Sequence, residues 1–178
     1  AILETSGLTD ELFKTVYVWV GSLRGGLAIA VIIAATIMAA MVGVVGASVV
    51  SMTIVGLPAM LRYKYDKGIA VGSIAAGGAL GALIPPSVPM VVYSFLSSVS
   101  VGRMFLGGIL PGLLLTALYI VYIGTRSSLS PELCPALGPE ERASWSEKLA
   151  SLRLVILPVL LIIAVLGSIF AGIATPTE

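Results

Sequence analysis

Serine hydroxyls beside helix-breaking residues are the groups in this 178-residue chain whose type and spacing offer chemistry. They occur in two places, after a run of small residues at 43–48 and after the Pro-Pro pair at 85–86. Where membrane helices break, carbonyl and hydroxyl oxygens bind Na⁺, and helix N-termini bind anionic groups. The pattern favours an ion and anion site over catalysis, with three candidate hydroxyls: Ser48, Ser51 and Ser87.

Catalytic side chains are scarce in this sequence. It contains no histidine, and its single cysteine, Cys134, lies in a polar segment. Proton relays, transition-metal sites and Ser-His pairs usually depend on histidine. We therefore predict no catalytic residue, no enzyme activity and no cofactor.

The composition indicates a bilayer environment. Hydrophobic residues make up 58% of the chain and charged residues 11%, with a mean hydropathy of +1.09. Soluble domains are roughly half apolar and about a quarter charged. Charges form short clusters that separate four uncharged intervals, each able to reach across or deep into roughly 30 Å of hydrocarbon. These intervals predict an all-α membrane protein and cover residues 25–61, 68–102, 104–125 and 154–177.

The segment 1–24 predicts an amphipathic helix that lies on the membrane surface. Its apolar residues recur at helical spacing, Thr9 suits an N-cap, and Tyr17 and Trp19 suit the headgroup region.

The next interval, 25–61, has an awkward length for a membrane helix. As one helix it would be about 50 Å long, too long for one crossing and slightly short for two. A re-entrant hairpin with its tip at 43–48 and a single tilted span are the two solutions. A hairpin leaves nine Lys and Arg on one side and only Arg103 opposite, whereas a single span divides them seven to three. The positive-inside rule favours the hairpin, with the nine cationic residues cytoplasmic.

Residues 68–99 predict a discontinuous transmembrane helix. Pro85 and Pro86 lack amide donors and disfavour helix before them, so the helix must break there. Three segments follow: a transmembrane helix at 103–123, a cytoplasmic loop with an amphipathic helix at 124–152, and a last span at 153–174.

Two breaks in consecutive segments predict a site between them. Lipid cannot satisfy carbonyls freed at membrane depth, so such breaks face protein, a cavity or an ion. A half-helix C-terminus suits Na⁺ and a half-helix N-terminus suits a carboxylate. Close helix packing is the alternative explanation for the small residues. Because the intervals hold no charged side chain, Na⁺ coupling fits better than a proton relay.

Several short motifs occur in order along the chain. The most specific are Ile-Pro-Pro-Ser at 84–87 and Ala-Thr-Pro-Thr-Glu at 174–178, and the others lie at 23–28, 43–48, 57–60, 65–68 and 111–112. In this order they resemble the large membrane subunit of TRAP transporters, the DctM family, over nearly the whole chain.

The resemblance implies an elevator-type secondary transporter of the ion transporter superfamily, driven by Na⁺, in the bacterial inner membrane. Its expected partners are a small membrane subunit, a periplasmic binding protein, the lipid bilayer and an organic acid, with no nucleic acid among them. It further implies that residues 175–178 begin a second inverted repeat of a longer protein. A symporter of the same superfamily that needs no binding protein, and a structural subunit, are the alternatives.

The resemblance also assigns roles to the two breaks. For Na⁺, mostly through backbone carbonyls, it implies Gly43, Gly46, Ser48, Ile84, Pro85 and Ser87. For the substrate it implies Ser48, Ser51, Pro86 and Ser87. The hairpin tip departs from the family pattern G-x-S-G-S-x-x-A-D, where this chain has Val45, Ala47, Val50 and Ser51, so that two hydroxyls and the acid are lost. We therefore expect backbone coordination there and a subgroup with a different substrate.

Overall fold

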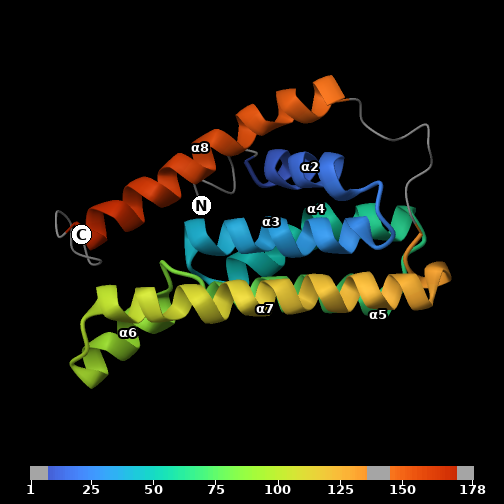
Figure 1. Ribbon diagram of the computed structural model, residues 1–178. Coiled ribbons are helices and arrows are strands. Elements are labelled where there is room, and N and C mark those ends of the chain that lie inside the picture. Colours follow the sequence, from blue (N-terminus) through green and yellow to red (C-terminus); the bar gives the residue numbers. More distant parts are fainter. Residues whose placement is uncertain (1–7, 136–144, 172–178) are drawn as a thin grey trace.

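The computed structural model describes residues 8–135 and 145–171, and every regular element in these ranges is a helix (Figure 1). The elements are α2 (Leu8–Val20), α3 (Gly26–Val42), α4 (Val45–Arg62), α5 (Lys67–Ala79), the 3₁₀ helix η1 (Leu80–Ala82), α6 (Val88–Ser97), α7 (Val101–Leu129), the 3₁₀ helix η2 (Pro131–Leu133) and α8 (Trp145–Phe170). The predicted all-α class is confirmed. Within the described ranges, three stretches are long and apolar enough to cross a membrane: Val45–Arg62, Val101–Leu129 and Ser151–Phe170.

Helix α3 is the centre of the bundle (Figure 1). It carries no charged residue, most of its side chains are buried, and it packs against α2, α4, α5 and α7. A helix that is apolar all round is suited to this position because every face is covered. A Cβ at Gly26 would collide with the carbonyl oxygen of Val20, so only glycine fits the turn between α2 and α3.

The interval 25–61 doubles back on itself at Gly43 and Val44, between α3 and α4. Its two ends lie close together. The backbone N–H of Leu27, near the start of α3, donates a hydrogen bond at 3.3 Å to the hydroxyl of Tyr65, three residues after the end of α4. The tip therefore lies at the start of the range predicted for it. Whether this hairpin re-enters the bilayer stays a prediction.

Helix α5 begins at Lys67 because Asp66 caps it. The Asp66 carboxylate accepts hydrogen bonds from the backbone N–H groups of Gly68 and Ile69, at 2.9 and 3.2 Å. The helix then packs against both α3 and α4. It ends in η1, and residues 83–87 separate η1 from α6.

After residue 103 the helices extend beyond the predicted segments in two places. Helix α7 continues to Leu129, since the hydroxyls of Ser127 and Ser128 bond to the Gly124 carbonyl inside the helix and leave it unbroken. Helix α8 runs without interruption from Trp145 to Phe170, so the predicted amphipathic helix and last span are parts of one helix. The chain offers no glycine or proline to separate them before Pro158. The expectations for residues 1–7 and 174–178 lie outside the described residues.

The segment that follows α7 joins the starts of two other helices. The Leu133 carbonyl accepts a hydrogen bond from the backbone N–H of Asp66 at 3.0 Å, and the Cys134 carbonyl accepts one from that of Gly25 at 3.4 Å. We call residues 133–134 with these two partners the clasp. Cys134 is buried here, contrary to its predicted polar surroundings. Burial, aided by the charge of Asp66, raises the pKa of its thiol.

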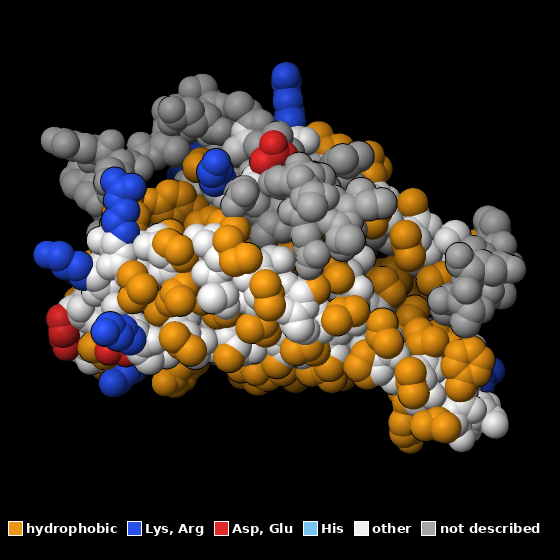
Figure 2. Space-filling model, turned by 180° about the vertical axis from the view of Figure 1, so that it is seen from behind, with side chains coloured by type: hydrophobic (Ala, Val, Ile, Leu, Met, Phe, Trp, Pro, Cys, Tyr) orange, Lys and Arg blue, Asp and Glu red, His pale blue; other side chains and the backbone are white. Residues whose placement is uncertain are grey.

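Basic side chains gather at one end of the molecule (Figure 2). Arg62 lies in the last turn of α4, Lys67 begins α5, and Arg126 lies in the last turn of α7. Arg103 lies in the first turn of α7, about 35 Å from Arg126 along the helix axis. This separation resembles the hydrocarbon thickness of a bilayer, so the charge distribution along α7 suits a crossing.

Candidate functional site

The two helix breaks touch each other through the backbone. Gly43 ends α3, and its carbonyl accepts a hydrogen bond from the N–H of Val88, the first residue of α6, at 3.2 Å. Gly43 has φ +66°, and a Cβ there would collide with the Pro86 carbonyl oxygen. Both the left-handed backbone and the close approach therefore require glycine.

Four helix ends meet around this contact. Helix α3 and η1 end there, while α4 and α6 begin there. Neither α4 nor α6 has a side-chain cap on its first turn, whereas Asp66 caps α5 at the other end of the broken helix. Uncapped N-termini carry partial positive charge and donor amides, and C-termini carry partial negative charge. The contact thus offers both signs of charge without an ionised side chain.

Ser87 is the hydroxyl most closely built into the break. It is 1% exposed, and its Oγ donates a hydrogen bond to the Ala82 carbonyl at the end of η1, at 2.8 Å. Because the hydroxyl acts as the donor in this bond, its lone pairs remain available to a cation or another donor.

Residues 84–86 are held in place by α7. The Ile84 side chain packs on Gly112, where a Cβ would lie 2.7 Å from Ile84 Cγ1. At Gly108, a Cβ would lie 2.7 Å from the Leu83 carbonyl oxygen. This support was not predicted, although Gly108, Gly112 and Thr116 at four-residue spacing mark one small-residue face of α7. Pro85 is fully buried beside Ile84 in this segment.

The small residues of α5 bring the broken helix against the hairpin. A Cβ at Gly77 would lie 2.8 Å from the Ala35 Cβ, and a Cβ at Gly81 would lie 3.3 Å from the Val45 nitrogen. The small residues therefore serve close helix packing, the alternative explanation for them, in the same helix that contains the break.

The structure separates the candidate residues of the hairpin. Gly43 lies at the contact, but Gly46 is exposed in the first turn of α4, where a Cβ would meet no atom within 4 Å. Ser48 and Ser51 are buried on α4, and the Ser48 hydroxyl lies 3.5 Å from the Val44 carbonyl to which it donates. Gly46 thus has no packing reason to be glycine.

Two cavities lie away from the breaks. One of about 480 Å³ lies between α5 and α7 and includes Asp66 and Arg126 in its lining, and one of about 400 Å³ lies between α2 and α4. In the described part of the chain, no group of three or more His, Cys, Asp or Glu side chains is placed to hold a metal ion. A cation at the breaks would depend on carbonyl and hydroxyl oxygens.

The fold and the two touching breaks define a helical, multi-pass membrane protein with discontinuous helices. The model of the family "Tripartite ATP-independent periplasmic transporter, DctM component" matches residues 1–178. The chain belongs to this family, as its motifs indicated.

Curated relatives agree with this assignment. The chain is 40% identical to the C4-dicarboxylate TRAP transporter large permease protein DctM of Vibrio cholerae, over 99% of the chain and 38% of the relative. It is 37% identical to the protein of the same name from Pseudomonas aeruginosa, over 100% of the chain and 40% of the relative. The ectoine TRAP transporter large permease protein TeaC of Halomonas elongata is 30% identical, over 95% of the chain and 38% of the relative. The chain thus spans about two-fifths of the length of these relatives.

Proposed function

We propose that this chain is part of the large permease subunit of a Na⁺-coupled secondary transporter that imports an organic acid across the bacterial inner membrane. In this proposal a periplasmic binding protein delivers the acid, and a small membrane subunit completes the complex. The chain acts as an elevator-type permease and not as an enzyme. The observation that carries the proposal is the contact of two helix breaks through the Gly43 carbonyl and the Val88 amide.

The Na⁺ part of the proposal rests on neutral oxygens. Gly43 uses one lone pair of its carbonyl for Val88, and a carbonyl oxygen has a second. Ser87 keeps its lone pairs while its hydrogen is donated to Ala82. The carbonyls of Ile84 and Pro85 belong to the non-helical segment beside it. A weakly held monovalent cation suits such a set because no ionised side chain has to be neutralised at membrane depth.

The carboxylate part rests on the uncapped helix starts. The first turn of α4 lacks a side-chain cap, so its amides and partial positive charge favour an anion. Helix α6 contributes mainly its partial positive charge, because its Val88 amide bonds to Gly43 and Pro89 has no N–H. Ser51 on α4 would add a hydroxyl donor, and Ser48 and Ser87 would do so by releasing their hydrogen bonds to the Val44 and Ala82 carbonyls, with Pro86 as part of the wall. The names of the Vibrio and Pseudomonas relatives, which specify C4-dicarboxylate, support an acid as the substrate class.

Replacing Ser87 tests the ion site. In proteoliposomes that contain the full-length complex and its binding protein, Ser87→Ala should raise the Na⁺ concentration for half-maximal uptake about tenfold. This corresponds to the loss of one oxygen ligand and one hydrogen bond, about 1.4 kcal/mol. Ser94→Ala is the matched control, because Ser94 is also buried and donates to the Met90 carbonyl on the same helix.

Three outcomes would contradict parts of the proposal. Equal uptake with and without a Na⁺ gradient would refute the coupling. Uptake at full rate without the binding protein would favour the independent symporter. Normal uptake by Ser87→Ala combined with poor complex assembly would favour a structural subunit.

A further inference from the structure

A groove between α2 and α4 has two cationic side chains on its rim. The cavity measures about 400 Å³, and among the residues that the structure describes its lining includes Lys14, Arg62, two tyrosines and apolar residues of both helices, but no Asp or Glu. Arg62 lies in the last turn of α4, and Lys14 is exposed in the middle of α2. The groove is therefore complementary to a group with negative charge.

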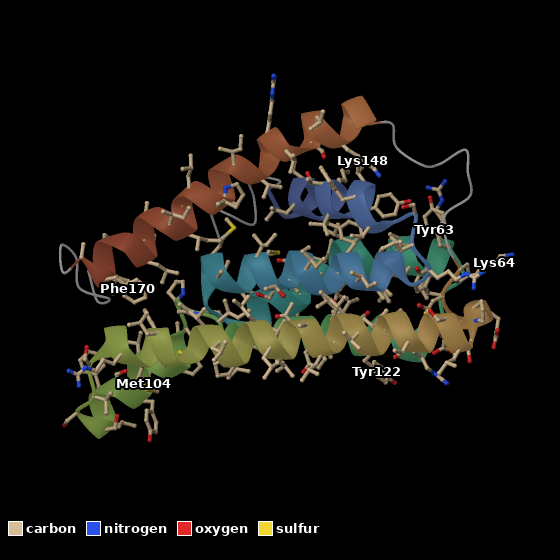
Figure 3. The ribbon with its side chains drawn as sticks, in the orientation of Figure 1. Tyr63, Lys64, Met104, Tyr122, Lys148 and Phe170 are labelled. Carbon is tan, nitrogen blue, oxygen red and sulfur yellow. The ribbon has the colours of Figure 1, made fainter. Side chains whose placement is uncertain are left out.

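The tyrosines of this groove form a hydrogen-bonded pair. The Tyr17 hydroxyl donates to the Tyr63 hydroxyl at 3.1 Å, and their rings lie 6.4 Å apart. Figure 3 shows Tyr63 at the end of α4, beside α2. Because Tyr63 accepts in this bond, its own hydrogen can point to an acceptor oxygen in the groove. Two cations and one hydroxyl donor are a suitable set for a phosphate diester.

An apolar track leads away from this polar end. Ile54 also lines the groove and is 70% exposed, and Val50, one turn further along α4, is 57% exposed. Val50 lies about 18 Å from Arg62 along the helix axis, and half of a bilayer's hydrocarbon core is about 15 Å. The track has the length of one acyl chain that starts at the headgroup level.

We propose that this groove binds an anionic phospholipid, with its phosphodiester at Lys14, Arg62 and Tyr63 and an acyl chain along Ile54 and Val50. A lipid fits better than a soluble anion because exposed Ile54 lines the same groove as the two cations, and exposed Val50 lies one turn beyond it on α4. The basic residues grouped at this end of the molecule place it where anionic headgroups lie in a cytoplasmic leaflet.

Lipid binding to the full-length complex tests the proposal. The delipidated complex in neutral detergent is titrated with dioleoylphosphatidylglycerol, dioleoylphosphatidylcholine or inorganic phosphate. Bound molecules are counted by native mass spectrometry, and the melting temperature is recorded. Phosphatidylglycerol should bind and raise the melting temperature, phosphatidylcholine should bind much more weakly, and phosphate should do neither.

The double variant Lys14→Gln/Arg62→Gln should weaken phosphatidylglycerol binding about thirty-fold, from two lost charges near the membrane surface. The matched control is Lys64→Gln/Lys67→Gln, which removes two charges at the same end but outside the groove. The control should retain binding, and both variants should melt cooperatively without lipid.

Several results would overturn the proposal. An equal loss in the control would indicate diffuse attraction to the basic end of the molecule. Equal binding of phosphatidylcholine would remove the role of charge, and an equal effect of phosphate would indicate a soluble anion. Absence of lipid from a stable complex would mean that a protein segment fills the groove.

Discussion

Gly43→Ala is the most informative single change at the helix breaks. An alanine at φ +66° costs about 1 kcal/mol or more. The new Cβ would collide with the Pro86 carbonyl oxygen, which belongs to backbone packed in the break and cannot move aside as a flexible side chain would. Relief of this collision breaks the hydrogen bond from Val88 to Gly43, at about another 1 kcal/mol. The contact between the breaks should lose about 2–3 kcal/mol, which lowers the population of the intact site roughly 30- to 160-fold.

The assay compares this variant with Gly46→Ala, three residues along the same chain segment. Gly46 has helical backbone and open space around its Cα, so alanine there should stabilise α4 by up to about 1 kcal/mol. Na⁺-dependent uptake by the reconstituted full-length complex and its melting temperature are measured for both. We expect Gly43→Ala to lose most uptake at physiological Na⁺ and Gly46→Ala to keep it. Equal behaviour of the two variants would refute the assignment of Gly43 to the site.

Two further predictions concern topology and a buried tyrosine. In a background without Cys134, single cysteines near Arg24 and near Tyr63 should both react with an impermeant thiol reagent from the cytoplasmic side. A single cysteine near Arg103 should react from the other side. Labelling of the first two from opposite sides would refute the re-entrant hairpin. Burial raises the pKa of Tyr65 from 10.0 to about 12, only partly offset by its bond from Leu27. The neutral phenol is thus favoured in the folded state, and its contribution to stability is complete below pH 10 and lost as the pH rises toward 12. Tyr65→Phe should have a lower melting temperature than the wild type at pH 8, because it loses about one hydrogen bond. Its melting temperature should fall less between pH 10 and 12 than that of the wild type, and an equal fall would contradict this role of Tyr65.

The hairpin could be predicted because it follows from properties of the sequence alone, namely segment length and the positions of charged residues. Its length was wrong for one crossing, and the positions of Lys and Arg favoured a reversal. The sequence could not distinguish Gly43 from Gly46, because that difference depends on Pro86, more than forty residues away. Likewise, the hydrogen bond from Ser87 to the end of η1 depends on the backbone path of residues 83–87. The two prolines predict a helix break there but not the path that the backbone takes.

Other differences came from hydrogen bonds and packing that the composition of a segment does not reveal. Cys134 was expected in polar surroundings, but its carbonyl bonds to Gly25 and its side chain is buried. The polar composition of residues 124–129 suggested a loop, whereas their hydroxyls bond to carbonyls of their own helix. The support of Ile84 by Gly112 could not be predicted, because it depends on how α7 packs against residues 83–86.

The clasp has a mechanical consequence. Near the basic end, it ties the starts of α3 and α5 to the end of α7, and at the other end of the hairpin the Gly43 carbonyl ties α3 to α6. The hairpin and the broken helix are therefore linked by hydrogen bonds near both of their ends. In the elevator mechanism that we propose, we expect the hairpin and the broken helix to move as a single body, so that the sliding surface lies outside them and the two breaks keep their mutual geometry.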